Sequence, residues 1–93
     1  MKIKLYMKLQ KTGEVVGKDK ETGDFLLKNS KGEVVKVSPL VFQLWDMVSD
    51  EKTVKQIVDE YVEFFGFGEY EARKSTKEVL QALVKKSLLS IKA

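Results

Sequence analysis

The residue types that usually carry catalysis are scarce in this 93-residue chain. It contains no Cys and no His, so it has no thiolate nucleophile, no disulfide and no imidazole to act as general base or metal ligand. Ser and Thr hydroxyls are present, but no imidazole can activate them as nucleophiles. We therefore predict that the protein is not an enzyme.

Carboxylates are numerous, but their pattern is that of a solvated surface. They fall on the polar positions of predicted helices, where charged residues usually face water. No Asp-x-Asp-x-Asp run suggests a calcium loop, and the short glycine segment at 66–68 lacks the Lys-Ser/Thr of a phosphate-binding loop. We expect no metal and no cofactor. The carboxylates concerned are Asp46, Asp50, Glu51, Asp59, Glu60, Glu63, Glu69, Glu71 and Glu78.

A different kind of chemistry, recognition through the backbone, is suggested by residues 33–37, which read E-V-V-K-V. Their alternation predicts a strand in which Val35 and Val37 share one face and Val34 and Lys36 the other. If this strand lies at a sheet edge, its unpaired N–H and C=O groups can accept a partner strand. The partner would be an extended peptide or, through the same exposed strand, a second copy of the chain.

Several lysines fall on or beside one face of a predicted helix at residues 69–87. Lys74, Lys77 and Lys85 would favour an acidic guest, with Gln81 among them. The same pattern also suits the solvated surface of a soluble helix, and the sequence leaves both interpretations open.

The elements that would position these groups are strands first and helices after. The alternating residues 2–9 predict a strand, either separate or the beginning of the next one, and Thr12-Gly13 breaks the pattern. Residues 14–18, 24–29 and 33–37 predict a three-stranded antiparallel β-meander with turns at 19–24 and 29–32.

Three helices follow the meander. Ser38 and Pro39 predict the beginning of the first helix, and Thr53 with Gln56 forms a capping box for the second. Gly66 predicts the end of that second helix, and residues 67–68 a loop. The third helix is predicted at 69–87, with a buried stripe, and a short apolar tail should pack back on the sheet. The stripe comprises Ala72, Thr76, Val79, Leu80 and Leu83, and the tail Leu88, Leu89 and Ile91.

Length and composition favour a single α+β domain spanning residues 1–93. The net charge of +3 is mild and neither requires nor excludes nucleic acid. No apolar run approaches the length of a membrane span, and the N-terminus does not read as a signal peptide. We expect a cytoplasmic protein that does not bind membranes.

The order of these motifs resembles the PqqD family. The resemblance lies in V-V-K-V-S-P, then L-V-F-Q-L-W-D-M-V, then T-V-K-Q-I-V-D-E-Y-V-E-F-F-G, and finally E-V-L-Q-A-L-V-K-K-S-L-L. It covers roughly residues 15–89, and its most specific parts are Thr53-Val54-x-x-Ile57-Val58 and the closing Leu88-Leu89. Ser49-Asp50 and Ser87 stand at two turn positions where the family often has Asp-Gly and Gly.

The resemblance implies a fold and a function. PqqD-like domains are recognition elements for ribosomally made, modified peptides, with three strands packed on three helices in a winged-helix-like arrangement. They bind the leader of a precursor peptide between the third strand and the third helix, and they present it to a modifying enzyme, often a radical S-adenosylmethionine protein. Carried onto this sequence, the expected peptide-binding residues are Glu33, Val34, Val35, Lys36, Val37, Tyr70, Lys74, Lys77, Gln81, Val84 and Lys85.

Two alternatives belong to other classes. Three short helices, a hairpin and a basic excess also fit a winged-helix DNA-binding regulator. The chain order argues against it, because a wing usually follows the recognition helix, and Glu71 and Glu78 interrupt the basic residues of the last helix. A weaker alternative is a contact domain of an enzyme subunit with no peptide ligand.

Overall fold

The computed structural model describes residues 2–66 and 69–92, so the loop predicted at 67–68 lies outside the described residues. The fold is α+β, with the three-stranded meander followed by three helices, as predicted. The elements are β1 (Lys8–Lys11), β2 (Glu14–Lys18), β3 (Phe25–Lys28), β4 (Val34–Val37), α1 (Pro39–Met47), α2 (Val54–Phe65), α3 (Glu69–Lys85) and β5 (Leu89–Lys92).

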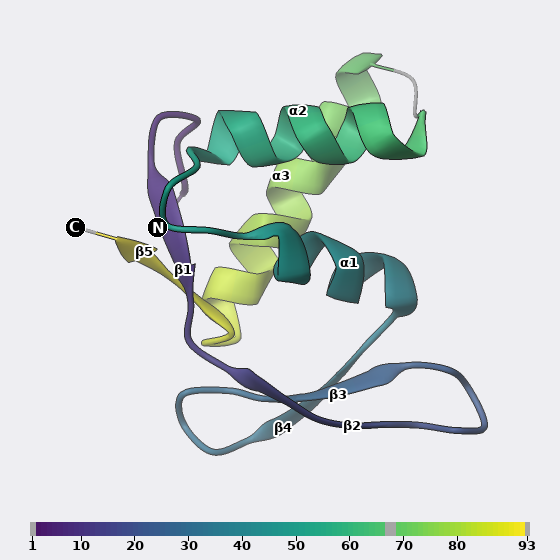
Figure 1. Ribbon diagram of the computed structural model, residues 1–93. Helices are drawn as coiled ribbons and strands as arrows, with labels where there is room; N and C mark the ends of the chain where they lie inside the picture. The colour runs from purple at the N-terminus through teal and green to yellow at the C-terminus, as the bar shows by residue number, and fades with distance from the viewer. Residues whose placement is uncertain (1, 67–68, 93) are drawn as a thin grey trace.

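The meander forms a three-stranded antiparallel sheet in the order β2-β3-β4. In the register of β3 and β4, Phe25 lies opposite Val37 and Leu27 opposite Val35. Figure 1 shows this sheet below the helices, with α1 directly above it. Phe25 of β3 stacks on Phe42 of α1, their ring centroids 3.9 Å apart, and this contact joins the two layers.

The prediction of a strand over residues 2–9 is wrong for most of its length. The chain turns at Leu5, where the N–H of Met7 bonds to the Lys4 carbonyl at 3.0 Å. The carbonyls of Leu5 and Met7 then accept the N–H groups of Lys55 (2.9 Å) and Val54 (2.8 Å) at the beginning of α2. These N–H groups have no partner within the helix, and residues 2–7 satisfy them instead of joining a ladder.

The strand that does form, β1, begins at Lys8 and is separate from the meander. It pairs antiparallel with β5, with Leu9 opposite Ile91. The C-terminal tail, predicted to pack back on the sheet, pairs with β1 and completes a second, two-stranded sheet (Figure 1).

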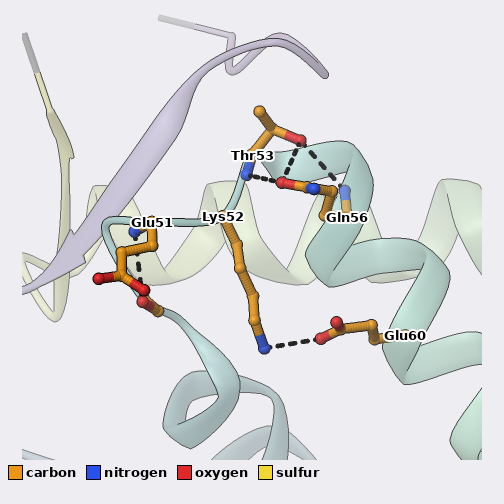
Figure 2. A network of polar contacts seen from close by, with 6 residues as sticks. Glu51, Lys52, Thr53, Gln56 and Glu60 are labelled. Atoms are coloured by element: carbon orange, nitrogen blue, oxygen red, sulfur yellow. Dashed lines mark hydrogen bonds and ion pairs between the residues drawn. The ribbon is translucent and has the colours of Figure 1, made fainter.

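The beginnings of the first two helices are confirmed. The Ser38 hydroxyl accepts the Val41 N–H at 3.3 Å, and Pro39 occupies the first turn. Figure 2 shows the capping box of α2: the Thr53 hydroxyl accepts the Gln56 N–H at 3.2 Å, while the Gln56 side-chain carbonyl accepts the Thr53 N–H at 2.8 Å. Two orphan donors are thereby satisfied.

The ends of the second and third helices lie at left-handed residues. Gly66 ends α2 with a φ of 67°, as predicted, because glycine has no Cβ to clash in this conformation. Helix α3 ends at Lys85, two residues before the predicted position, and Ser87 then adopts a φ of 61°. This turn directs the chain into β5.

One apolar core joins both sheets and all three helices. The largest fully buried side chains come from the N-terminal segment, β1, β3, α1, α2, α3 and the C-terminal segment: Ile3, Leu9, Leu27, Leu44, Val54, Ile57, Leu80, Leu88 and Leu89. Trp45 is also buried, and its indole N–H donates to the Leu88 carbonyl at 2.9 Å. Among the helices of the described residues, none is long and apolar enough to cross a membrane.

Candidate functional site

Strand β4 forms one edge of the three-stranded sheet. Within residues 2–66 and 69–92 it pairs only with β3. The Asn29 N–H bonds to the Glu33 carbonyl at 2.8 Å, and hydrogen-bonded pairs alternate in an antiparallel ladder. Val35 and Val37 therefore bond to β3, whereas the N–H and C=O groups of Val34 and Lys36 point away from the sheet.

The opposite edge of this sheet, β2, is built differently. Its register shifts between Val15 and Gly17, which marks a bulge in the pairing with β3. A bulge bends the strand and breaks the regular spacing that a further strand needs. Strand β4 pairs without a shift, so it is the edge of this sheet that can accept a guest strand in register.

The two faces of β4 have separate tasks, as its alternation predicted. Val37 is buried and Val35 half-buried on the inner face, while Val34 is 60% exposed on the outer face. The Lys36 ammonium lies 2.8 Å from the Asp19 carboxylate. Its hydrogen bond lowers the pKa of the Asp19 carboxyl from 3.8 to about 2 and raises the pKa of Lys36. The Lys36 side chain therefore has a partner within the chain. Its backbone N–H and C=O groups can still bond to a guest strand.

The beginning of β4 is tied to the end of α3 by a buried asparagine. The Asn29 side-chain amide donates to the Lys86 carbonyl at 2.9 Å and to the Glu33 carboxylate at 3.0 Å. Its carbonyl accepts the N–H groups of Lys31 and Glu33. These four bonds fix the turn before β4 against the last turn of α3, and they orient Glu33.

An apolar hollow opens at the other end of β4, between α1 and α3. Its volume is about 750 Å³, and mainly apolar or small side chains surround it. The Tyr61 hydroxyl donates to the Leu40 carbonyl at 3.0 Å and holds the first turn of α1 against α2, and burial raises the Tyr61 pKa. The lining residues are Ser38, Leu40, Val41, Leu44, Tyr61, Tyr70, Glu71, Ala72, Ser75, Thr76 and Val79.

Helix α3 has two flanks, one on each side of its buried stripe. Thr76, Leu80 and Leu83 of the predicted stripe are buried, while Ala72 and Val79 are half-buried. The groove flank, defined by Glu71, Ser75 and Val79, borders the hollow at the end of β4. The lysine flank, defined by Lys74, Lys77 and Gln81, lies on the other side, against the N-terminal segment.

The structure brings only part of the predicted site together. Residues 33–37 form the edge, and the 80% exposed Tyr70 stands at the mouth of the hollow. Lys74, Lys77 and Gln81 lie on the lysine flank, where the Gln81 side-chain carbonyl accepts the Ile3 N–H at 2.8 Å. Val84 lines a different hollow with Thr12 and Ser30, and Lys85 is exposed.

Apart from Tyr70, the residues that line the hollow were not among the predicted site residues. Leu40 and Val41 come from α1, and Ser75 and Val79 from α3. A signal existed, because Glu71, Ser75 and Val79 are spaced by four and share one side of a helix. Small and apolar residues in such a row leave room beside a helix, whereas the lysines attracted attention by their charge.

Comparisons with protein-family models, with curated proteins and with solved structures found no match to this chain. Within the described part of the chain, no three His, Cys, Asp or Glu side chains gather as a metal site requires. A functional proposal therefore depends on the edge, the hollow and the charges of the molecule.

Proposed function

We propose that the protein is a non-catalytic peptide-binding adaptor of the PqqD-like kind. It binds the leader segment of a ribosomally made precursor peptide and presents it to a modifying enzyme, such as a radical S-adenosylmethionine protein. The observation that carries the proposal is the regular outer edge of β4, which is followed in the chain by Ser38 at the lining of the apolar hollow between α1 and α3. The order of three meander strands and three helices agrees with what the family resemblance implies.

The binding mode is addition of a strand. The N–H and C=O groups of Val34 and Lys36 offer four backbone hydrogen bonds to an extended guest, each contributing about 1 kcal/mol net. Beyond Val37 the guest enters the hollow, where it meets Leu40, Val41 and Val79. Its apolar side chains are bound there, and the backbone fixes their spacing.

The expected affinity is moderate. Four backbone bonds contribute about 4 kcal/mol, and about 400 Å² of buried apolar surface contributes about 10 kcal/mol at 25 cal/mol per Å². Ordering a flexible leader costs about 5 kcal/mol. The remainder is close to the roughly 8 kcal/mol that corresponds to micromolar binding.

The test is a titration of the ¹⁵N-labelled protein with a synthetic leader from a precursor peptide encoded beside its gene. We expect the largest amide shifts at Val34, Lys36, Ser75 and Val79, because these residues line the edge and the hollow. Shifts scattered over other surfaces, or none with any such leader, would contradict the proposal. Dimerisation that the leader does not reverse would show that a second copy occupies the edge instead.

A further inference from the structure

The lysine flank of α3 borders two adjoining hollows, which share only Tyr70 with the lining of the proposed peptide site. The larger, about 620 Å³, lies between α2, α3 and the N-terminal segment. Lys74 and Lys77 line both, which makes the two hollows one surface. The larger is lined by Leu5, Lys55, Val58, Asp59, Tyr70, Arg73, Lys74 and Lys77, and the smaller by Lys2, Lys74, Lys77, Glu78 and Gln81.

This surface accounts for the positive charge of the molecule. Its lining contains five cationic side chains and two carboxylates, an excess of three, which equals the net charge of +3 of the whole chain. The remaining positive and negative charges of the sequence therefore balance. A positive field of this kind attracts anionic groups to one face of the protein.

Three of the five cations have no counter-ion among the described residues. Lys55 and Arg73 both pair with Asp59, the former at 2.8 Å. Lys2, Lys74 and Lys77 make no ion pair among the residues that the structure describes. Their ammonium groups are available to an external anion.

The surface also has an apolar part, which favours a protein over a nucleic acid. Leu5 is 46% exposed and Tyr70 80% exposed, and both line the larger hollow. A phosphate backbone would leave this apolar surface uncovered. A polypeptide with both acidic and apolar side chains satisfies both parts.

We propose that the lysine flank binds an acidic segment of a partner protein that also carries apolar side chains. This surface lies across α3 from the groove flank, and Tyr70 is the one lining residue that the two occupants would share. If the proposed function holds, this partner is the enzyme that modifies the bound peptide; this identification rests on the proposed function. The acidic and apolar chemistry of the segment rests only on the surface itself.

The test uses a fluorescein-labelled synthetic peptide of about 12 residues, rich in Glu and Leu, and measures its anisotropy at about 50 mM salt. The double variant Lys74→Glu, Lys77→Glu is compared with Lys20→Glu, Lys31→Glu, whose positions lie in the turns of the meander. Both doubles change the net charge from +3 to −1. We expect the first to weaken binding about tenfold or more and the second by less than about twofold.

A third variant, Val34→Pro, separates this inference from the proposed function. It alters the β4 edge and should leave binding of the Glu/Leu peptide unchanged. If Val34→Pro abolishes that binding and the lysine-flank variant does not, the inference is overturned and a peptide site on β4 remains. Absence of binding, equal loss in both double variants, or preferential binding of a duplex DNA oligonucleotide at the lysine flank would also overturn it.

Discussion

The two flanks of α3 differ in what they offer to a binding partner. The groove flank combines small and apolar side chains with the free backbone of β4 nearby, so it suits an extended chain held by hydrogen bonds and burial. On the lysine flank, Lys74 and Lys77 make no ion pair within the described part of the chain, and they line a hollow with an exposed leucine and tyrosine. A single helix thus presents two different surfaces, one on each side of its buried stripe, and they meet at Tyr70.

The largest expected effect is on stability, and it comes from truncating one side chain of the buried stripe that lies between the two flanks. Leu80 is completely buried, and Leu80→Ala should lower the free energy of unfolding by about 3 kcal/mol through lost contacts and the resulting cavity. Urea denaturation measures this change. Lys85→Ala, at an exposed position of the same helix, should change the free energy by less than about 0.5 kcal/mol. Equal effects of the two substitutions would contradict the assignment of the stripe.

A substitution on β4 should affect the groove side alone. Val34→Pro removes an outward N–H and keeps the bonds to β3, since proline is tolerated at sheet edges. We expect the affinity for the leader peptide to fall about tenfold, or about 1.4 kcal/mol, in calorimetric titrations. The control Val34→Ala keeps the N–H and should lose less than about threefold. If the alanine variant loses as much as the proline variant, side-chain contacts rather than backbone pairing hold the guest.

A substitution on the lysine flank should affect the contact of α3 with the N-terminal segment alone. Gln81→Ala removes the acceptor of the Ile3 N–H and should cost about 1 kcal/mol of stability. Hydrogen exchange at the Ile3 amide should become faster, whereas leader binding at β4 should stay the same. Ser75→Ala, on the groove flank, is the matched control and should leave that amide unchanged.

The smallest expected effect is a dependence on pH at the outer face of the meander. The folded-state pKa of Asp19 lies near 2, below its ordinary 3.8, because Lys36 donates a hydrogen bond to the carboxylate. The ionised form is favoured by folding, so its contribution is present above about pH 4 and is lost as the pH falls through about 2. An NMR titration should show the Asp19 pKa returning towards 3.8 in Lys36→Gln. An unchanged value would show that the pair does not form in solution.

Local signals predicted most of the fold. The Ser38 cap, the Thr53–Gln56 capping box and Gly66 each depend on contacts between near neighbours in the sequence, and all three were found. The strand predicted over residues 2–9 failed because alternation does not reveal a competing partner. In the structure, Leu5 and Met7 bond to the exposed N–H groups of α2, which lie about fifty residues away in the chain.

The candidate site was predicted in part for the same reason. The alternation within β4 correctly separated Val35 and Val37 from Val34 and Lys36, because a strand has only two faces. Side chains point in many directions around a helix, and the sequence alone does not show which side of α3 lies nearest to β4. Lys74 and Lys77, which were predicted at the peptide site, lie on the side of α3 away from the hollow. The pairing of β5 with β1 joins segments about eighty residues apart, which no local pattern reveals.

The four hydrogen bonds of Asn29 give the proposed peptide site a closed end and an open end. Asn29 bonds to Glu33 and to the Lys86 carbonyl, so the turn before β4 is fixed against the end of α3, and we expect a bound chain to stop there. At Ser38 the path leads on into the space between α1 and α3. We therefore expect the length of the paired segment to be limited at the Asn29 end. The rest of the peptide would extend from the other end, towards the modifying enzyme.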